Sequence, residues 1–250
     1  MSFVTESRWQ PLPSHNPENP DNTAYERPLG TTEVAFYWDA EFMGTADTVR
    51  YAEVRIISGN RDEVVNPERI TKAWTSLKTC FPLLGARIEE RGKDSVFFIV
   101  SEEWLQSCQV DEISFRDVSS SEDVLAFVDG MLVKGRPLSN NLLARLFVLQ
   151  RKDNPSSFHL VFYVAHCITD GMGNIAILKA FLNELCGSSP PKSWTLKDRL
   201  ALSVASEDLH PNRSLCISRR RWRNAIASVI GAARAAKLKV GLPSYTANTE

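Results

Sequence analysis

Apolar positions along the chain follow two different periods, which together predict interleaved strands and helices. Residues 49–57 are rich in β-branched side chains, as is typical of a strand. Residues 70–81 instead repeat apolar side chains every three or four positions, which predicts an amphipathic helix. Asn66 is expected to cap this helix with Pro67 at its first position, and Pro82 is expected to end it.

The same criteria predict further elements in the middle of the chain. Short strands are expected at 84–88 and 96–100, and Gly92 between them suggests a hairpin. Ser121 is expected to cap a second helix, and residues 141–150 follow as a strand.

The next expected strand, 158–165, is apolar at nearly every position. Such a strand is buried on both faces and takes a central place in a sheet. An amphipathic helix follows it to about Cys186, with an inner stripe of Ile175, Leu178, Phe181, Leu182 and Leu185. Strands and helices interleave without strict alternation, which predicts a mixed α/β fold with a central mixed sheet and flanking helices.

The two ends of the chain differ from this middle part. Residues 1–30 contain five prolines and few apolar residues, so we expect an irregular arm before a folded lobe at 31–190. Residues 191–250 are expected to form a linker and a helix. Residues 209–249 contain no acidic residue but eight basic ones: Arg213, Arg219, Arg220, Arg221, Arg223, Arg234, Lys237 and Lys239.

This C-terminal stretch also carries an apolar stripe, formed by Trp222, Ile226, Val229, Ile230 and Ala233. The pattern is that of a basic amphipathic helix. One interpretation is contact with an anionic membrane surface through residues 219–239, or with a protein partner. The favoured interpretation is that the apolar face packs on protein, because most amphipathic helices pack on their own domain.

Composition narrows the class of protein. The 250 residues suffice for one large or two small domains, and a net charge of −1 argues against a nucleic-acid partner. The five cysteines are scattered without zinc-ligand spacing, so we expect neither a metal site nor a disulfide framework. No apolar run is long enough to span a membrane, and the N-terminus does not resemble a signal peptide. A reducing, cytoplasmic location is expected.

The candidate chemistry lies where the central strand ends. His166, Asp170 and Gly171 form an H-x-x-x-D-G pattern at the strand-to-helix turn. A single histidine after a buried strand is usually structural, but here a carboxylate follows four residues later, where the helix begins. Imidazole suits general-base catalysis because its ordinary pKa lies near neutrality. The N-terminus of the following helix would also stabilise a developing anion.

Other catalytic classes find less support. The serines at 119–121 and 188–189 lack a G-x-S-x-G setting, so a serine hydrolase is not expected. Cys167 is adjacent to His166 and should point to the opposite face, as a small buried side chain rather than a nucleophile. Glycine-rich nucleotide-binding motifs do not occur.

The pattern at His166, Asp170 and Gly171 resembles the H-x-x-x-D-G motif of chloramphenicol-acetyltransferase-like, CoA-dependent acyltransferases. Residues 81–87 and 135–148 look like the segments that flank this motif region in the family, and the resemblance covers roughly residues 30–190. It implies the fold of a single lobe of these enzymes. It also implies acyl-CoA as co-substrate, a small-molecule acceptor and no bound cofactor.

The resemblance further implies roles for the motif residues. His166 would be the general base that takes a proton from an acceptor hydroxyl or amine as it attacks the thioester. Asp170 would be architectural, paired with an arginine that the sequence does not identify, and Gly171 would leave room at the substrate tunnel. The resemblance assigns no residues to cofactor binding.

Two departures from the family leave alternatives open. Ala165 stands where condensation domains of peptide synthetases usually carry a second histidine, which favours a free-standing O- or N-acyltransferase. Family members are about twice as long and have two lobes, and the D-F-G-W-type motif of the second lobe does not occur here. We therefore expect one lobe that needs a second lobe or a protein partner. The alternatives are an inactive half-enzyme acting as an interaction module, and a condensation-type domain served by a carrier protein.

Overall fold

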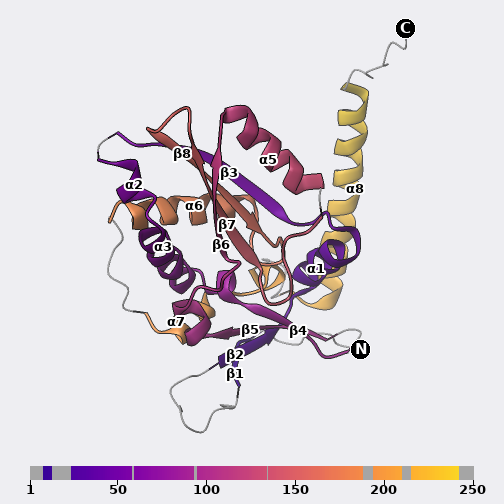
Figure 1. Ribbon diagram of the computed structural model, residues 1–250. Helices are drawn as coiled ribbons and strands as arrows, with labels where there is room; N and C mark the ends of the chain where they lie inside the picture. The colour runs from indigo at the N-terminus through magenta and orange to yellow at the C-terminus, as the bar shows by residue number, and fades with distance from the viewer. Residues whose placement is uncertain are drawn as a thin grey trace. The chain divides into compact units, whose positions relative to one another are not determined.

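Two four-stranded sheets form the framework of the chain (Figure 1). The computed structural model describes residues 8–12, 24–57, 59–92, 95–133, 135–187, 194–209 and 215–241. The chain forms two compact units, Met1–Ser206 and Glu207–Glu250, and both sheets belong to the first unit.

The larger core lies around the mixed sheet, here called sheet B, with the strand order β3-β8-β7-β6. The central strand β8 (Ser157–Val164) is buried at every position and pairs antiparallel with β3 (Thr48–Arg55) and β7 (Ala144–Arg151). Strand β6 (Ile113–Val118) pairs parallel with β7. The predicted central, doubly buried strand and the mixed sheet are therefore confirmed, whereas β6 was not predicted.

Helices cover both faces of sheet B (Figure 1). On one face, α3 (Pro67–Cys80) and α6 (Gly171–Leu185) pack on the β8 side chains that point toward them, as in the edge-on contact of Phe162 with Phe181. On the other face, α1 (Thr31–Met43) and α5 (Ser121–Val133) contribute to a second core. Alternate residues of one apolar strand thus serve two separate cores.

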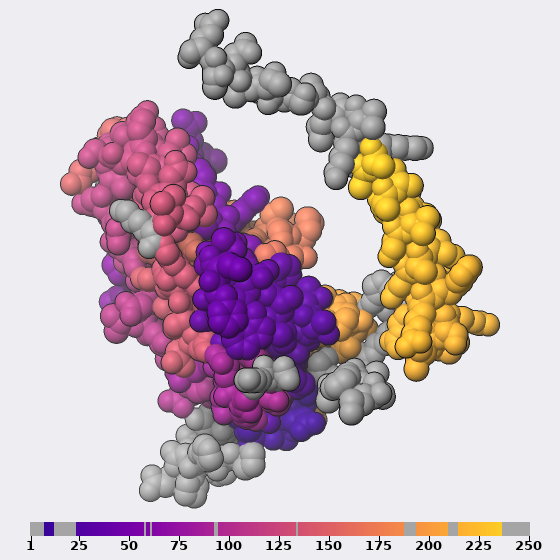
Figure 2. All heavy atoms as spheres, turned by 90° about the vertical axis from the view of Figure 1, so that its right-hand side faces the viewer, coloured from indigo at the N-terminus to yellow at the C-terminus, as the bar shows by residue number. Residues whose placement is uncertain are grey.

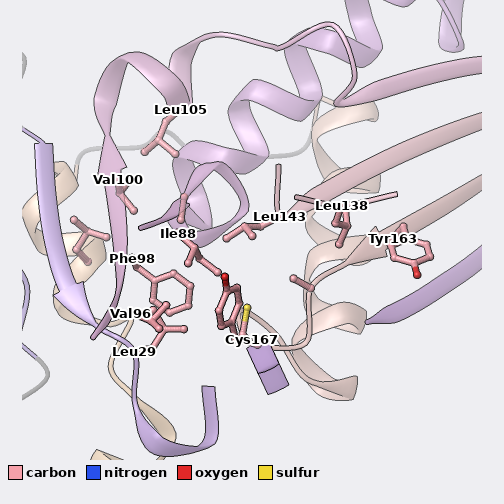
Figure 3. Close-up of a cluster of buried hydrophobic side chains, with 14 of the residues drawn as sticks. Leu29, Ile88, Val96, Phe98, Val100, Leu105, Leu138, Leu143, Tyr163 and Cys167 are labelled. Atoms are coloured by element: carbon pink, nitrogen blue, oxygen red, sulfur yellow. The ribbon is translucent and has the colours of Figure 1, made fainter. Parts of the chain in front are cut away.

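The second sheet, sheet A, is antiparallel and consists of β1 (Gln10–Pro11), β2 (Ala24–Pro28), β5 (Val96–Ser101) and β4 (Arg87–Glu90) in that order. Its buried side chains join the core on the α1 and α5 side of sheet B. Figure 3 shows Phe98 of sheet A pointing into the same cluster as Leu143 and Cys167.

The structure corrects the expected irregular arm at residues 1–30, because β2 lies within it and pairs with β5. Strand β2 was not predicted because its five residues, AYERP, form a short segment in which two are charged. Arg27 is nevertheless fully buried, since both ends of its guanidinium bond Glu33 at 2.7 Å. A charged residue can occupy the core here because its charge is neutralised and its donors are paired.

The predicted helix α3 (Pro67–Cys80) and the hairpin after it are present, and only the start of the first hairpin strand differs from the prediction. Asn66 caps α3 as predicted, its side chain accepting a hydrogen bond from Glu68 N at 2.8 Å. The strand expected from residue 84 begins only at Arg87, because Pro82–Gly85 forms a short 3-10 helix. Proline at the first position of that helix has the backbone angle that a helix requires. The helices α2 (Arg61–Val64) and α4 (Glu102–Gln106) complete this part.

The first unit also extends beyond the expected boundary at residue 190. Helix α7 (Leu196–Ala201) buries Leu196 and Leu200 in the core of this unit. The carbonyl of Ser203 then accepts hydrogen bonds from Trp9 Nε1 at 3.0 Å and from Arg27 Nε at 3.2 Å. A short 3-10 helix, Ser206–Leu209, follows.

The second unit contains the helix α8 (Ile217–Gly241), which the sequence predicts. Its large apolar side chains Trp222, Ile226, Val229 and Ile230 are exposed. Among the described residues, no helix combines the length and the apolar character needed to cross a membrane.

Candidate active site

The turn between β8 and α6 holds the H-x-x-x-D-G residues together. Strand β8 ends at Val164, and Ala165 N still donates a hydrogen bond to Leu143 O at 2.9 Å. The chain then turns, and α6 begins at Gly171 with Asp170 as its cap. His166 lies in this turn and is partly buried. The sequence thus placed His166, Asp170 and Gly171 correctly at a strand-to-helix junction.

The hydrogen bond of His166 defines which ring nitrogen is available. Its Nδ1 lies 2.7 Å from the carbonyl oxygen of Thr169. A carbonyl oxygen can only accept, so Nδ1 carries the proton in this contact. In the neutral ring, Nε2 is therefore the unprotonated nitrogen, with a lone pair that can accept a proton.

The plane of the imidazole is fixed by Phe36 of α1. The two rings stack with centroids 3.9 Å apart and planes 9° apart. Phe36 is partly buried and packs against the core on this side of sheet B. The Thr169 carbonyl and the Phe36 ring thus restrain the imidazole both in its plane and across it. Neither α1 nor Phe36 was predicted from sequence.

Asp170 acts on the backbone of the turn. Its Oδ1 accepts a hydrogen bond from Gly173 N at 2.7 Å, which caps α6. Among the described residues, no arginine forms an ion pair with Asp170. Close packing occurs at Gly173, where an added Cβ would collide with the Thr169 hydroxyl, while the space around Gly171 is open.

An acidic and basic cluster that the sequence did not reveal lies nearby. Arg136 follows Gly135, whose φ is 96°, and donates from Nε to Asp47 Oδ2 at 2.7 Å and from Nη1 to Glu41. Burial raises the pKa of Asp47, and the hydrogen bond and charge of Arg136, together with the charge of His166, oppose this shift. Arg136 is therefore paired with Asp47 and Glu41.

A chain of hydrogen bonds joins the elements around the turn. Asn174 of α6 donates to the hydroxyl of Thr48 at 3.0 Å, and this hydroxyl donates to Val164 O at 2.9 Å. Since Thr48 starts β3 and Val164 ends β8, the beginning of α6 is tied to both strands. This arrangement holds the histidine turn on regular secondary structure.

Two further residues with reactive side chains, Cys167 and His159, are buried. Cys167 is buried, and burial, followed by the charges of Glu33 and Asp47, raises the pKa of its thiol to about 12. It is the small buried side chain that the sequence predicts. His159 is fully buried, with Nδ1 2.9 Å from the Tyr51 hydroxyl, and burial lowers its pKa. His15 and His210 lie outside the described residues.

The comparisons with known proteins bear on the fold. No protein-family model and no curated protein matches this sequence. Among solved structures, TRI3 trichothecene 15-O-acetyltransferase from Fusarium sporotrichioides is similar over 90% of this chain and 48% of its own, with a TM-score of 0.59 at 11% identity. The tallysomycin biosynthesis protein TlmII is similar over 79% of this chain and 44% of its own, with a TM-score of 0.58 at 18% identity.

A third similar structure is a variant of the starter condensation domain of the rhizomide synthetase RzmA. It matches 68% of this chain and 40% of its own, with a TM-score of 0.51 at 11% identity. This chain thus spans less than half the length of each of the three structures. At these identities the likeness establishes the fold alone, and it confirms the mixed α/β lobe of the chloramphenicol-acetyltransferase-like and condensation-domain fold.

Proposed function

We propose that this chain carries the histidine-bearing lobe of an acyltransferase that moves an acyl group from acyl-CoA to a hydroxyl or amine of a small metabolite. The observation that carries the proposal is the bond from His166 Nδ1 to Thr169 O, which leaves Nε2 as the proton acceptor. That histidine stands at the strand-to-helix turn of a fold found in an acetyltransferase and in condensation domains.

The proposed reaction follows from this orientation. Nε2 of His166 takes the proton from the acceptor O–H or N–H while the acceptor attacks the thioester carbonyl carbon. The tetrahedral intermediate collapses and breaks the C–S bond, and the imidazolium returns its proton to the departing CoA sulfur. Atoms and charge balance without a further co-reactant. Phe36 and the Thr169 carbonyl keep the ring in one orientation through both proton transfers.

The environment of Ala165 supports acyl-CoA over a carrier-protein donor. Ala165 stands just before His166, and only 1% of it is exposed. It packs in the core with Cys167 and Tyr163. A second histidine at this position would have to enter that core, which requires repacking. This packing supports a proposed site with one histidine.

The proposal is tested on the protein as isolated from its source cells, together with any second lobe or partner protein that accompanies it. Release of free CoA and formation of acyl product are measured with acyl-CoA donors of increasing chain length, against a panel of alcohols and amines. The same acceptors are then offered with acyl-carrier-protein donors. We expect turnover with acyl-CoA and a loss of about 10²- to 10⁴-fold in His166→Ala.

Two controls make the result specific. His15→Ala removes a histidine outside the motif and is expected to retain full activity, and circular dichroism verifies that each variant is folded. Full activity in folded His166→Ala would overturn the role of the histidine. Turnover with carrier-bound donors alone would favour a condensation-type domain, and no turnover with either donor would favour an interaction module.

A further inference from the structure

Helix α8 combines a strong positive charge with exposed apolar side chains. Its 25 residues, Ile217–Gly241, extend over about 37 Å at the usual rise of a helix. The segment contains seven basic residues and no acidic one. A helix of this charge is attracted to an anionic partner. Its apolar side chains help to distinguish a membrane from a nucleic acid as that partner.

The apolar side chains of α8 gather on one side. At about 100° per residue, Trp222, Ile226, Val229, Ile230 and Ala233 fall within one half of the helix. The exposed fractions are 70% for Trp222, 69% for Val229, 47% for Ile230 and 42% for Ile226. Arg220 and Arg221 fall on the other half and Arg234 at its edge, whereas Arg219 and Arg223 fall beside the apolar positions. The helix, yellow in Figure 2, thus has an apolar stripe that is bordered by basic residues.

The first unit completes its cores with residues of its own. The buried residues of both hydrophobic clusters lie between Leu29 and Leu200. Helix α8 belongs to the second compact unit, Glu207–Glu250. The sequence favoured packing of its apolar face on protein. Within the described part of its own unit, α8 leaves four large apolar side chains exposed among basic residues, and this combination favours an anionic environment.

We propose that α8 binds the surface of an anionic phospholipid membrane, lying parallel to it. Amphipathic helices with arginine and lysine on one face and tryptophan and aliphatic residues on the other insert their apolar face at the headgroup boundary. Trp222 suits that boundary because its ring is apolar and its N–H is polar. The arginines reach the lipid phosphates by extending their side chains outward.

The apolar face distinguishes this partner from a nucleic acid. A nucleic acid would neutralise the arginines through its phosphates but would leave Trp222, Ile226 and Ile230 in water. An anionic membrane instead takes up the apolar side chains and binds the basic ones through its lipid phosphates. The proposed contact is peripheral, with α8 lying at the headgroup boundary.

The experiment measures flotation of the full chain with vesicles of phosphatidylcholine containing about 30% phosphatidylserine, and with pure phosphatidylcholine. We expect binding to the anionic vesicles that weakens markedly when salt rises from about 0.1 to 0.5 M. In Arg220→Gln/Arg221→Gln/Arg234→Gln, vesicle affinity is expected to fall more than tenfold, since each basic residue contributes about fivefold. Trp222→Ala/Ile226→Ala/Ile230→Ala keeps the charge and is expected to lose binding as well.

A matched control removes exposed apolar side chains from another helix. Phe42 and Met43 of α1 are 75% and 73% exposed, so Phe42→Ala/Met43→Ala is expected to bind vesicles like the unchanged chain. Absence of binding, or equal binding to neutral vesicles, overturns the proposal. Binding to duplex DNA that needs the arginines but not Trp222 overturns it in favour of a nucleic acid. Lipid-independent self-association that the alanine variant abolishes overturns it in favour of a second copy.

Discussion

Phe36 lies flat against His166, with ring centroids 3.9 Å apart and ring planes inclined by 9°. The two residues come from helix α1 and from the turn after β8, and the stack joins them across more than a hundred positions of sequence. Together with the carbonyl of Thr169, Phe36 prevents the imidazole from tilting and from turning over. The orientation of the proposed base is thus a property of the folded lobe itself.

Removal of the Phe36 ring is therefore expected to reduce turnover. In Phe36→Ala and Phe36→Leu, kcat should fall about 2- to 10-fold, the range that aromatic pairing energies imply. Phe36→Leu retains most of the apolar bulk and should preserve the thermal stability that Phe36→Ala loses. Nitrogen-15 NMR of the His166 ring should show broadened or averaged tautomers in both variants. Unchanged kcat and unchanged ring signals in Phe36→Leu would show that the stack serves packing only.

The two glycines that begin α6 are expected to respond differently to alanine. In Gly173→Ala, the new Cβ meets the Thr169 hydroxyl and approaches Asp170 Oδ1 to 3.2 Å, so the helix cap is disturbed. We expect a loss of about 1 kcal/mol in the free energy of unfolding, the usual value of such a cap. Gly171→Ala is the matched control, since its Cβ meets nothing within 4 Å. Urea denaturation of both variants checks this, and equal stabilities would contradict the assignment.

Cys167 is expected to resist alkylation in the native protein. Burial, with the charges of Glu33 and Asp47, raises the pKa of its thiol to about 12, so the protonated form predominates below that pH. At about pH 8 roughly one such thiol in ten thousand is ionised, and only the thiolate reacts. Mass spectrometry after iodoacetamide treatment should show modification at the exposed Cys80, Cys186 and Cys216 first. Rapid labelling of Cys167 without unfolding would contradict its burial.

Removal of only one charge of the buried Lys78–Glu112 ion pair is expected to destabilise the fold strongly. Lys78 Nζ lies 2.8 Å from Glu112 Oε2, and Glu112 also accepts a hydrogen bond from Trp74 Nε1 at 2.6 Å. Lys78→Met leaves the buried carboxylate of Glu112 without its counter-charge. It should lower the free energy of unfolding by about 3–5 kcal/mol. Lys78→Met/Glu112→Gln removes both charges and keeps an acceptor for Trp74. It should be more stable than Lys78→Met alone in denaturant unfolding.

A histidine at position 165 provides a separate test of the single-histidine site. Ala165→His forces an imidazole into a position where 1% of the residue is exposed, so we expect a destabilisation of about 1–3 kcal/mol from overpacking. Ala165→Ser is the milder control, because it adds one atom. Differential scanning calorimetry compares the three proteins. A fully stable Ala165→His variant would show that the fold accommodates the paired histidines of condensation domains.

The sequence predicted the parts of the fold that a local pattern determines. Strand β8 followed from an unbroken apolar run, α3 from its cap and period, and His166 and Asp170 from their spacing. Phe36, Asp47 and Arg136 could not be found in this way. Their contacts join a helix, a loop and a turn that are distant in sequence, and nothing in the flanking residues indicates which segments meet.

Two of the strands that the sequence did not predict, β2 and β6, were missed for a related reason. Strand β2 has the sequence AYERP, and its burial depends on the pairing of Arg27 with Glu33 in the next helix. Strand β6 has partly exposed side chains and gains its place by parallel pairing with β7. Charge neutralisation and strand pairing are tertiary effects, so residue patterns alone do not report them.

The carbonyl of Ser203 has a consequence for the order in which the lobe forms. It accepts hydrogen bonds from Trp9 and Arg27, so the first and last segments of the unit complete each other. A ribosome that has synthesised both sheets and the histidine turn still holds a chain whose earliest strands lack this partner. We expect the nascent lobe to stay susceptible to proteases until the residues around Ser203 emerge from the exit tunnel. We therefore expect folding of the lobe to finish only after its last segment has been translated.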